Sequence, residues 1–267
     1  MQAMIFCAGL GTRLKPLTDT MPKALVPMAG KPLLQWQVEK LRDAGITDIV
    51  INVHHFPDQI IDAVRANNGW GCDIAISDER DALLDTGGGL KKAQSQITNH
   101  KSQMASEPLL ACNVDILSNI DLRALIAEYE RISALPSARN GVGLLVVSDR
   151  PTQRYLCFDD NQRLTGWTNI ATGEVRPENV KSQISNLKLL AFSGMQILSP
   201  DILSLLSHMP KDKFSLIDFY MSLCEKNLSP FTSHLSPLKA YIPDAFKMMD
   251  VGKIDQIAEA ERFAESL

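Results

Sequence analysis

Short apolar runs alternate along the first half of the chain with longer segments in which apolar side chains recur every three or four positions. The runs are typical of buried strands, and the longer spacing is typical of helices with one face on a core. The pattern predicts strands at residues 3–7, 48–53, 74–77, 109–113 and 143–147, and helices at residues 32–44, 58–67, 90–96 and 121–131. This alternation indicates an α/β fold, with a Rossmann-like, mostly parallel central sheet that carries helices on both faces.

The pattern changes in the second half of the chain. The stretch RYLCFDDNQRLTGW predicts two short strands around a polar turn at residues 159–162, and the segment up to residue 186 is polar. A strand is expected at residues 187–198, followed by Ser199 and Pro200 as the N-cap and first residue of a helix at 201–207. A last helix is expected at residues 254–263. We therefore expect one domain over residues 1–267, with a small β-rich insertion.

Composition excludes several classes of protein. The chain has 267 residues and a formal net charge of −4, which argues against a general nucleic-acid binder. No stretch approaches the length of a membrane span, and the N-terminus lacks the pattern of a signal peptide. Five cysteines are scattered without a close pair, which favours buried thiols over disulfides or zinc ligands. A cytoplasmic protein without a membrane partner is the expectation.

The segment FCAGLGTRLK places two glycines and an arginine directly after the first strand. A dinucleotide-binding turn is excluded, because Leu14 occupies the position of the third glycine and no acid ends the second strand. A glycine turn whose amides hold an anion remains, with the guanidinium of Arg13 able to bind phosphate oxygens and Lys23 close behind. A tight turn that carries solvated basic residues is the alternative.

Three further places carry candidate chemistry. Asp115 follows a buried strand at the carboxyl edge of the sheet, and Asp121 is better placed to cap the next helix. A carboxylate there is able to hold Mg²⁺. The loop Gly87–Gly89 offers a flat surface to a base or a sugar, with a hinge as the alternative. Asp250 alone resembles an ordinary turn aspartate.

Longer motifs resemble a known family. AGLGTRLKPLTDTMPKALVPMAGKPLL closely resembles the signature of sugar-1-phosphate nucleotidyltransferases, and DTGGGLKKA, NVDIL, AFSGMQILSP and MMDVGKIDQIAEAE extend the likeness over the chain. Within that family the chain looks most like the compact N-acetylmuramate 1-phosphate uridylyltransferases. Mannose-1-phosphate guanylyltransferases are the nearest alternative.

The resemblance implies a nucleoside triphosphate and a sugar 1-phosphate as partners, with Mg²⁺ as cofactor. It assigns residues 1–135 to a nucleotide-binding half and 136–267 to a sugar-binding half. Arg13 and Lys23 become the catalytic residues, and Asp115 and Asp250 the metal ligands. The nucleotide site would comprise Ala8, Gly9, Leu10, Gly11, Thr12, Arg13, Lys23, Thr86, Gly87 and Gly88. The sugar site would comprise Gly88, Asn113 and Gly194.

The chain also departs from the family. Many relatives carry a Glu-Lys-Pro whose lysine meets the sugar phosphate, and TGWTNIATGE stands in its place here. The candidates that remain for this role are Arg154, Lys181 and Lys188. A non-catalytic nucleotide-sugar binder and a glycosyltransferase are alternative functions, although the latter expects Asp-x-Asp where this chain has Asn113-Val114-Asp115. The oligomeric state, monomer or homodimer, stays open.

Overall fold

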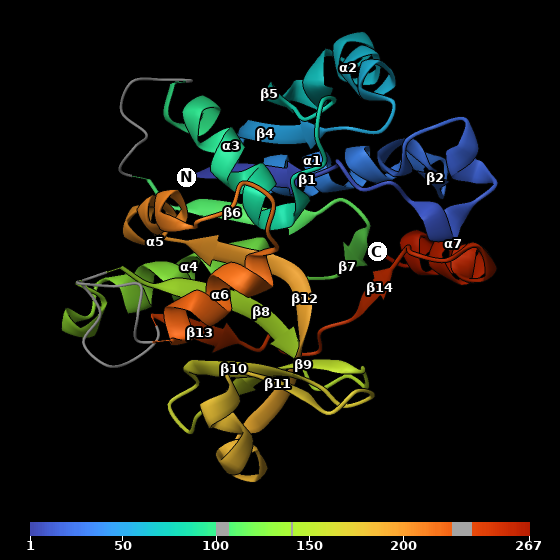
Figure 1. Cartoon of the computed structure of the whole chain (residues 1–267). Helices are drawn as coiled ribbons and strands as arrows, with labels where there is room; N and C mark the ends of the chain where they lie inside the picture. Colours follow the sequence, from blue (N-terminus) through green and yellow to red (C-terminus); the bar gives the residue numbers. More distant parts are fainter. Residues whose placement is uncertain (100–106, 140, 226–236) are drawn as a thin grey trace.

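The first strand, β1 (Gln2–Phe6), is an interior strand of the sheet, and every one of its residues is buried. It pairs in parallel with β4 (Asp48–Val53) on one side and with β6 (Leu109–Asn113) on the other, and β5 (Asp73–Asp78) extends the sheet beyond β4. The computed structural model describes residues 1–99, 107–139, 141–225 and 237–267 (Figure 1). The parallel arrangement predicted for the first half of the chain is confirmed.

Antiparallel pairing begins at β12 (Lys188–Leu198), which lies against β6, β8 (Gly143–Ser148) and β9 (Arg154–Phe158). Strands β10 (Leu164–Asn169) and β11 (Glu174–Arg176) extend the sheet on the far side of β9. They form the expected β-rich part at the bottom of Figure 1. Strand β13 (Leu238–Tyr241) returns beside β8 in parallel. The short pairs β2–β3 (Pro27–Met28 and Lys31–Pro32) and β7–β14 (Ile116–Ser118 and Met248–Asp250) lie outside this sheet.

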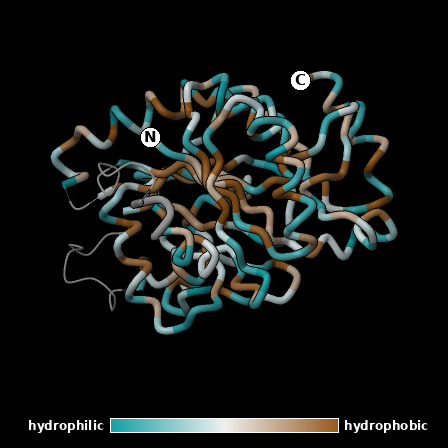
Figure 2. The backbone as a smooth tube through the Cα atoms, turned by 90° about the horizontal axis from the view of Figure 1, so that it is seen from above, coloured by the Kyte–Doolittle hydropathy of each residue, from teal (hydrophilic) through white to brown (hydrophobic). Residues whose placement is uncertain are grey.

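Successive residues of β1 point to opposite faces of the sheet, and helices pack against each face. Ala3 and Ile5 face a core with α1 (Leu33–Asp43), α2 (Pro57–Ala66), α4 (Leu122–Ser133) and α7 (Ile257–Glu265). Met4 and Phe6 face a second core with α3 (Asp85–Asn99), α5 (Pro200–Ser204) and α6 (Leu216–Cys224). The segments with the most hydrophobic residues lie at the centre of the molecule in Figure 2.

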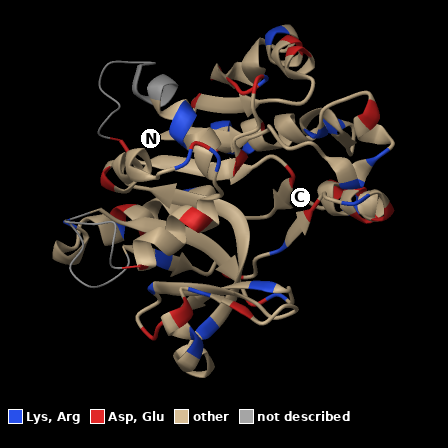
Figure 3. Ribbon diagram, viewed as in Figure 1, with Lys and Arg blue, Asp and Glu red and all other residues tan. Residues whose placement is uncertain are grey.

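Two predicted helix caps are confirmed. The Asp121 carboxylate accepts hydrogen bonds from the backbone amides of Arg123 and Ala124, and the Ser199 hydroxyl accepts one from Ile202. Lysines, arginines and carboxylates are interspersed along the helices and loops (Figure 3). Across the described ranges, no helix is both long and apolar enough to traverse a bilayer. All five cysteines lie in those ranges and are free thiols, of which Cys7, Cys112 and Cys157 are buried and Cys72 and Cys224 are half-buried.

Two helices differ from the sequence expectation. Helix α3 begins at Asp85 instead of residue 90, so Gly87–Gly89 form part of its first turn and not a loop. Helix α6 was not predicted. Its signal was present, because Ser215 and Asp218 form a capping box in which each side chain accepts a hydrogen bond from the backbone of the other. Strand β13 was also missed, since its four residues carry too little periodicity to be recognised.

Candidate active site

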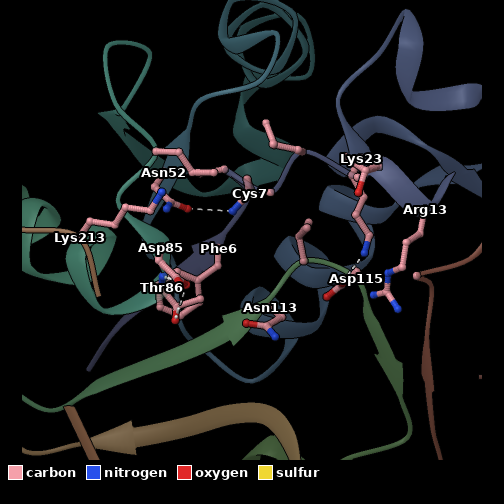
Figure 4. A pocket seen from close by; sticks show the side chains of 18 residues that line it. Phe6, Cys7, Arg13, Lys23, Asn52, Asp85, Thr86, Asn113, Asp115 and Lys213 are labelled. Carbon is pink, nitrogen blue, oxygen red and sulfur yellow. Dashed lines mark hydrogen bonds and ion pairs between the residues drawn. The ribbon is translucent and has the colours of Figure 1, made fainter. Parts of the chain in front are cut away.

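A cavity of about 530 Å³ opens at the carboxyl ends of β1, β4 and β6 (Figure 4). Ligands of open α/β sheets bind at this edge, where connections leave neighbouring strands in opposite directions. The cavity size suits a small organic molecule. It is lined by Phe6, Cys7, Ala8, Gly9, Leu10, Gly11, Thr12, Arg13, Lys23, Asn52, Leu83, Asp85, Thr86, Asn113, Val114, Asp115, Lys213 and Gly252.

The glycine turn forms one wall of the cavity. Gly11 has φ +64°, and a Cβ there would lie 2.8 Å from Thr18 Cγ2 and 3.2 Å from Lys23 Cβ. Only glycine fits this position without displacing its neighbours, because it tolerates both the left-handed backbone and the close approach. A Cβ on Gly9 would meet no atom within 4 Å. The glycine at position 9 is therefore not required by packing, and it leaves the backbone open toward the cavity.

Lys23 and Asp115 lie together on the cavity wall. Lys23 is the first residue of a short helix, is buried, and forms an ion pair with the Asp115 carboxylate (Figure 4). Asp115 stands between β6 and β7, beyond the carboxyl end of the central sheet. The ion pair joins the glycine segment to the strand that the sequence analysis singled out.

Asp250 ends strand β14, which pairs with β7 so that Asp250 lies opposite Ile116. The backbone amide of Val251 donates to the Asp115 carbonyl at 2.9 Å, which holds the two aspartates side by side. A Cβ on Gly252 would lie 2.6 Å from Asp250 Oδ1 and 2.9 Å from an Nη of Arg13. The pairing of β7 with β14 thus brings Asp250 next to Asp115 and Arg13, although Asp250 itself does not line the cavity.

Electrostatics of this cluster involve both signs of charge. Loss of solvation, and then the nearby carboxylate of Asp115, raise the pKa of Asp250. The positive charges of Lys23, Arg13 and Arg150 oppose that rise. Within the described ranges no group of three or more His, Cys, Asp or Glu side chains is arranged to hold a metal. Two neighbouring carboxylates fit Mg²⁺, which binds one or two protein carboxylates and completes its shell with phosphate oxygens and water.

The three glycines of α3 have a packing role. The amides of Gly87 and Gly88 both donate to the Phe214 carbonyl, at 2.9 and 3.0 Å. A Cβ on Gly88 would lie 2.0 Å from the Asp212 carbonyl oxygen, and one on Gly87 would lie 2.4 Å from the Phe214 ring. The segment before α6 therefore occupies the surface that was expected to receive a base or sugar. Of the residues expected here, Thr86 lines the cavity, whereas Gly87 and Gly88 do not.

The sugar-side candidates divide in a similar way. Asn113 lines the cavity. Gly194 does not line it but lies behind Asn113: its φ is +73°, and a Cβ there would be 2.6 Å from Asn113 Nδ2. The register of β12 shifts between Phe192 and Gln196, which places Gly194 in an irregular part of the strand.

Sequence reasoning missed three residues near the cavity. Asn52 accepts from the Cys7 amide at 2.8 Å and donates to the Glu79 carboxylate at 2.8 Å, which anchors the start of the glycine turn. Lys213 lines the cavity from the segment before α6. Arg150 lies after β8, and one of its Nη atoms donates to the Phe192 carbonyl at 2.9 Å. A signal for Arg150 existed, since it follows a predicted strand at the same sheet edge as Asp115.

The three sequence candidates for binding the sugar phosphate lie elsewhere. Arg154, Lys181 and Lys188 are exposed on the β-rich part of the chain, and none of them lines the cavity.

Comparison with known proteins identifies the family of this chain. The model of the nucleotidyl transferase family matches residues 2–266, and the chain belongs to that family. An N-acetylmuramate alpha-1-phosphate uridylyltransferase of Caulobacter vibrioides is 41% identical over 225 residues, which cover 83% of each chain. The enzyme of the same name from Neisseria meningitidis is 40% identical over 202 residues, covering 76% of this chain and 77% of the relative.

More distant relatives share the fold. A mannose-1-phosphate guanyltransferase of Kluyveromyces lactis is 27% identical over 256 residues, which cover 95% of this chain and 62% of the relative. Among solved structures, a UDP-glucose pyrophosphorylase complexed with UDP-glucose superposes with a TM-score of 0.71 at 17% identity, covering 100% of this chain and 99% of that one. HddC from Yersinia pseudotuberculosis, complexed with GMP-PN, gives a TM-score of 0.68 at 22% identity and covers 98% of each chain. The predicted fold class is confirmed.

Proposed function

We propose that the protein transfers a uridylyl group from UTP to N-acetylmuramate 1-phosphate and releases pyrophosphate. The observation that carries the proposal is the meeting, in one cavity, of the glycine turn, Lys23 and Asp115 (Figure 4). The relatives that are about 40% identical act on these substrates by name. Transfer of GMP to mannose 1-phosphate is the second candidate, which the name of the 27% identical relative supports.

The reaction forms a bond between a phosphate oxygen of the sugar 1-phosphate and the α-phosphorus of the triphosphate. The bond from that phosphorus to the oxygen bridging it to the β-phosphate breaks, and pyrophosphate leaves with the electron pair. The attacking phosphate is already an anion near neutral pH, so the step needs no general base. Burial also raises the pKa of the Cys7 thiol well above its usual range, so this lining residue does not supply a thiolate nucleophile near neutral pH.

Catalysis then consists of positioning two anions and neutralising their charge. The amides of the glycine turn and the Arg13 guanidinium would hold the β- and γ-phosphates, and Lys23 would contact the α-phosphate. Asp115 and Asp250 would hold Mg²⁺, which supplies positive charge to the phosphoryl oxygens when bound. Asn113 would contact the sugar, with Gly194 supporting it from behind. In this scheme residues 1–135 bind mainly the nucleotide and residues 136–267 mainly the sugar.

Arg150 is the strongest candidate for binding the sugar phosphate. Arg150 does not line the cavity, but its Nη bond to Phe192 fixes the guanidinium at the end of β8, and its charge acts on the Asp250 carboxylate. Among the described residues its Nε is buried and has no hydrogen-bond partner, so donor capacity remains. A guanidinium suits a phosphate because it donates through two parallel N–H groups.

A grid of substrates tests the proposed function. The purified chain is incubated with Mg²⁺, each of the four nucleoside triphosphates and a set of sugar 1-phosphates, and pyrophosphate release is measured. UTP with N-acetylmuramate 1-phosphate is expected to react fastest. Fastest release from GTP with mannose 1-phosphate would establish the second candidate. No release from any pair would leave a nucleotide-sugar binder without transferase activity.

A further inference from the structure

Lys213 and Asp85 lie at the end of the cavity away from Arg13 and Lys23. Figure 4 shows Lys213, Asp85 and Thr86 on one side, and Lys23, Asp115 and Arg13 on the other. Both Lys213 and Asp85 line the cavity, and both residues are exposed. The proposed function uses the Arg13 end for the phosphates and assigns no task to either of these two charged side chains.

Hydrogen bonds to the start of α3 hold the backbone that follows Lys213. The Phe214 amide donates to the Leu84 carbonyl at 3.2 Å, and the Phe214 carbonyl accepts from the first turn of α3. The Leu216 amide donates to the Thr86 hydroxyl at 3.0 Å. These bonds tie the residues that follow Lys213 to the segment that carries Asp85. The Lys213 side chain is therefore exposed, while hydrogen bonds hold the backbone that follows it.

Asp85 also has an unusual conformation. Its φ is +63°, a left-handed backbone conformation that is uncommon for a residue other than glycine. One carboxylate oxygen accepts from the Thr86 amide at 2.6 Å, which sets the direction of the side chain. Strained residues of this kind gather at functional sites. The orientation of Asp85 toward the cavity is thus maintained at a cost to the backbone.

The Lys213 ammonium and the Asp85 carboxylate do not neutralise each other. Within the described part of the chain neither Lys213 nor Asp85 has an ion-pair partner within 4.0 Å. The neighbour of Lys213 behaves differently, because Asp212 pairs with Lys91 at 3.3 Å outside the cavity. The cavity wall consequently presents one strong acceptor and one strong donor to whatever fills the space.

A nucleoside triphosphate whose phosphates lie at Arg13 and Lys23 must place its base farther along the cavity. Uracil and guanine present a ring N–H beside a carbonyl oxygen on their pairing edge. Cytosine and adenine present the reverse, a ring nitrogen acceptor beside an amino group. A carboxylate and an ammonium at the same end of the cavity complement the first pair and oppose the second.

We propose that Asp85 and Lys213 select the base, with the carboxylate accepting the ring N–H and the ammonium donating to the adjacent carbonyl. The inference rests on the proposed function for the direction in which the nucleotide lies. It assigns uracil- and guanine-type bases as ligands and excludes cytosine and adenine. Pairs of hydrogen bonds to a base edge discriminate by about 10- to 100-fold.

Binding of UMP, GMP, CMP and AMP to the full-length protein, measured by calorimetry, tests the inference. Wild type is expected to prefer UMP or GMP over both CMP and AMP by about 10-fold or more. Lys213→Met and Asp85→Asn are each expected to reduce that preference, and thermal melting confirms that both variants are folded. Lys211→Met is the matched control, because Lys211 is exposed on the same segment and does not line the cavity.

The calorimetric result is independent of catalysis. If the substrate grid shows no pyrophosphate release, the proposed function fails, while the binding preferences still decide the role of Lys213 and Asp85. Equal binding of all four nucleotides by wild type would overturn the inference. A preference that survives both substitutions in folded protein would overturn it as well.

Discussion

Lys23 and Asp115 form an ion pair although 92 positions separate them in the sequence. Their side chains are only 10% and 20% exposed, so each neutralises a charge that is largely removed from water. Removing one partner of such a pair leaves the other charge uncompensated. The same two residues are proposed to bind the α-phosphate and Mg²⁺, so their mutual bond must give way to substrate when the complex forms.

Replacing Lys23 tests its place in the reaction. Lys23→Met is expected to lower kcat by about 10²- to 10³-fold, the usual effect of removing one preorganised charge from a transition state. Pyrophosphate release under saturating substrates gives kcat, and a melting curve confirms folding. Lys15→Met is the control, because Lys15 is exposed and pairs with Asp19. Undiminished turnover of Lys23→Met would remove Lys23 from the mechanism.

The two aspartates are expected to govern the metal requirement. Asp250→Asn removes one carboxylate from the proposed site and should raise the Mg²⁺ concentration for half-maximal activity by about 10-fold or more. Titration of activity with MgCl₂ measures this. Asp255→Asn, an exposed position five residues along the chain, should leave the titration unchanged. Coincident titration curves for wild type and Asp250→Asn would contradict the assignment.

An added methyl group is expected to lower stability at Gly88 and to weaken triphosphate binding at Gly9. Gly88→Ala forces a Cβ against the Asp212 carbonyl, so the free energy of unfolding should fall by about 1–3 kcal/mol. Gly9→Ala has room for its Cβ and should not lower that free energy, but it should raise KM for the triphosphate because the methyl group stands beside the turn amides. Urea unfolding and steady-state kinetics measure the two effects. Equal stability of the two variants would contradict the packing argument.

Arg150 is expected to affect one substrate selectively. Arg150→Gln should raise KM for the sugar 1-phosphate by about 10- to 100-fold, the effect of losing one charge-assisted hydrogen bond. KM for the triphosphate should change little. Arg154→Gln, an exposed arginine at the start of β9, is the matched control. A larger effect of Arg154→Gln would return the phosphate site to the candidates expected from the sequence.

Lys40 is expected to give the stability a pH dependence. Its Nζ donates to Ser118 Oγ at 3.1 Å, and burial lowers the pKa of Lys40 to about 8. Between that value and the ordinary 10.5 the unfolded chain binds more protons, so the free energy of unfolding should rise with pH. Lys40→Met should lack this contribution, whereas Lys253→Met, at an exposed position, should retain it. Parallel urea-midpoint profiles for Lys40→Met and wild type from pH 8 to 10.5 would refute the linkage.

Local patterns in the sequence were sufficient for the parallel half of the sheet and for much of the site. The strand before Asp115 was recognisable from its apolar run, and the caps at Asp121 and Ser199 from residue type. Arg13 and Lys23 were recognisable because they follow a glycine turn after a strand. Each of these features depends on neighbours within a few positions, which a single sequence displays directly.

Tertiary structure decided which of these pieces meet. Asp250 lies next to Asp115 only because β14 pairs with β7. Arg150 lies near these two aspartates only because β8 pairs antiparallel with β12. The sequence suggested that the glycines of α3 form a surface for a ligand, but the segment before α6 packs against them. That packing also carries Lys213 into the cavity. Contacts of this kind join residues far apart in the chain, and strand order and helix packing determine them, whereas periodicity in the sequence reports only local conformation and which face is buried.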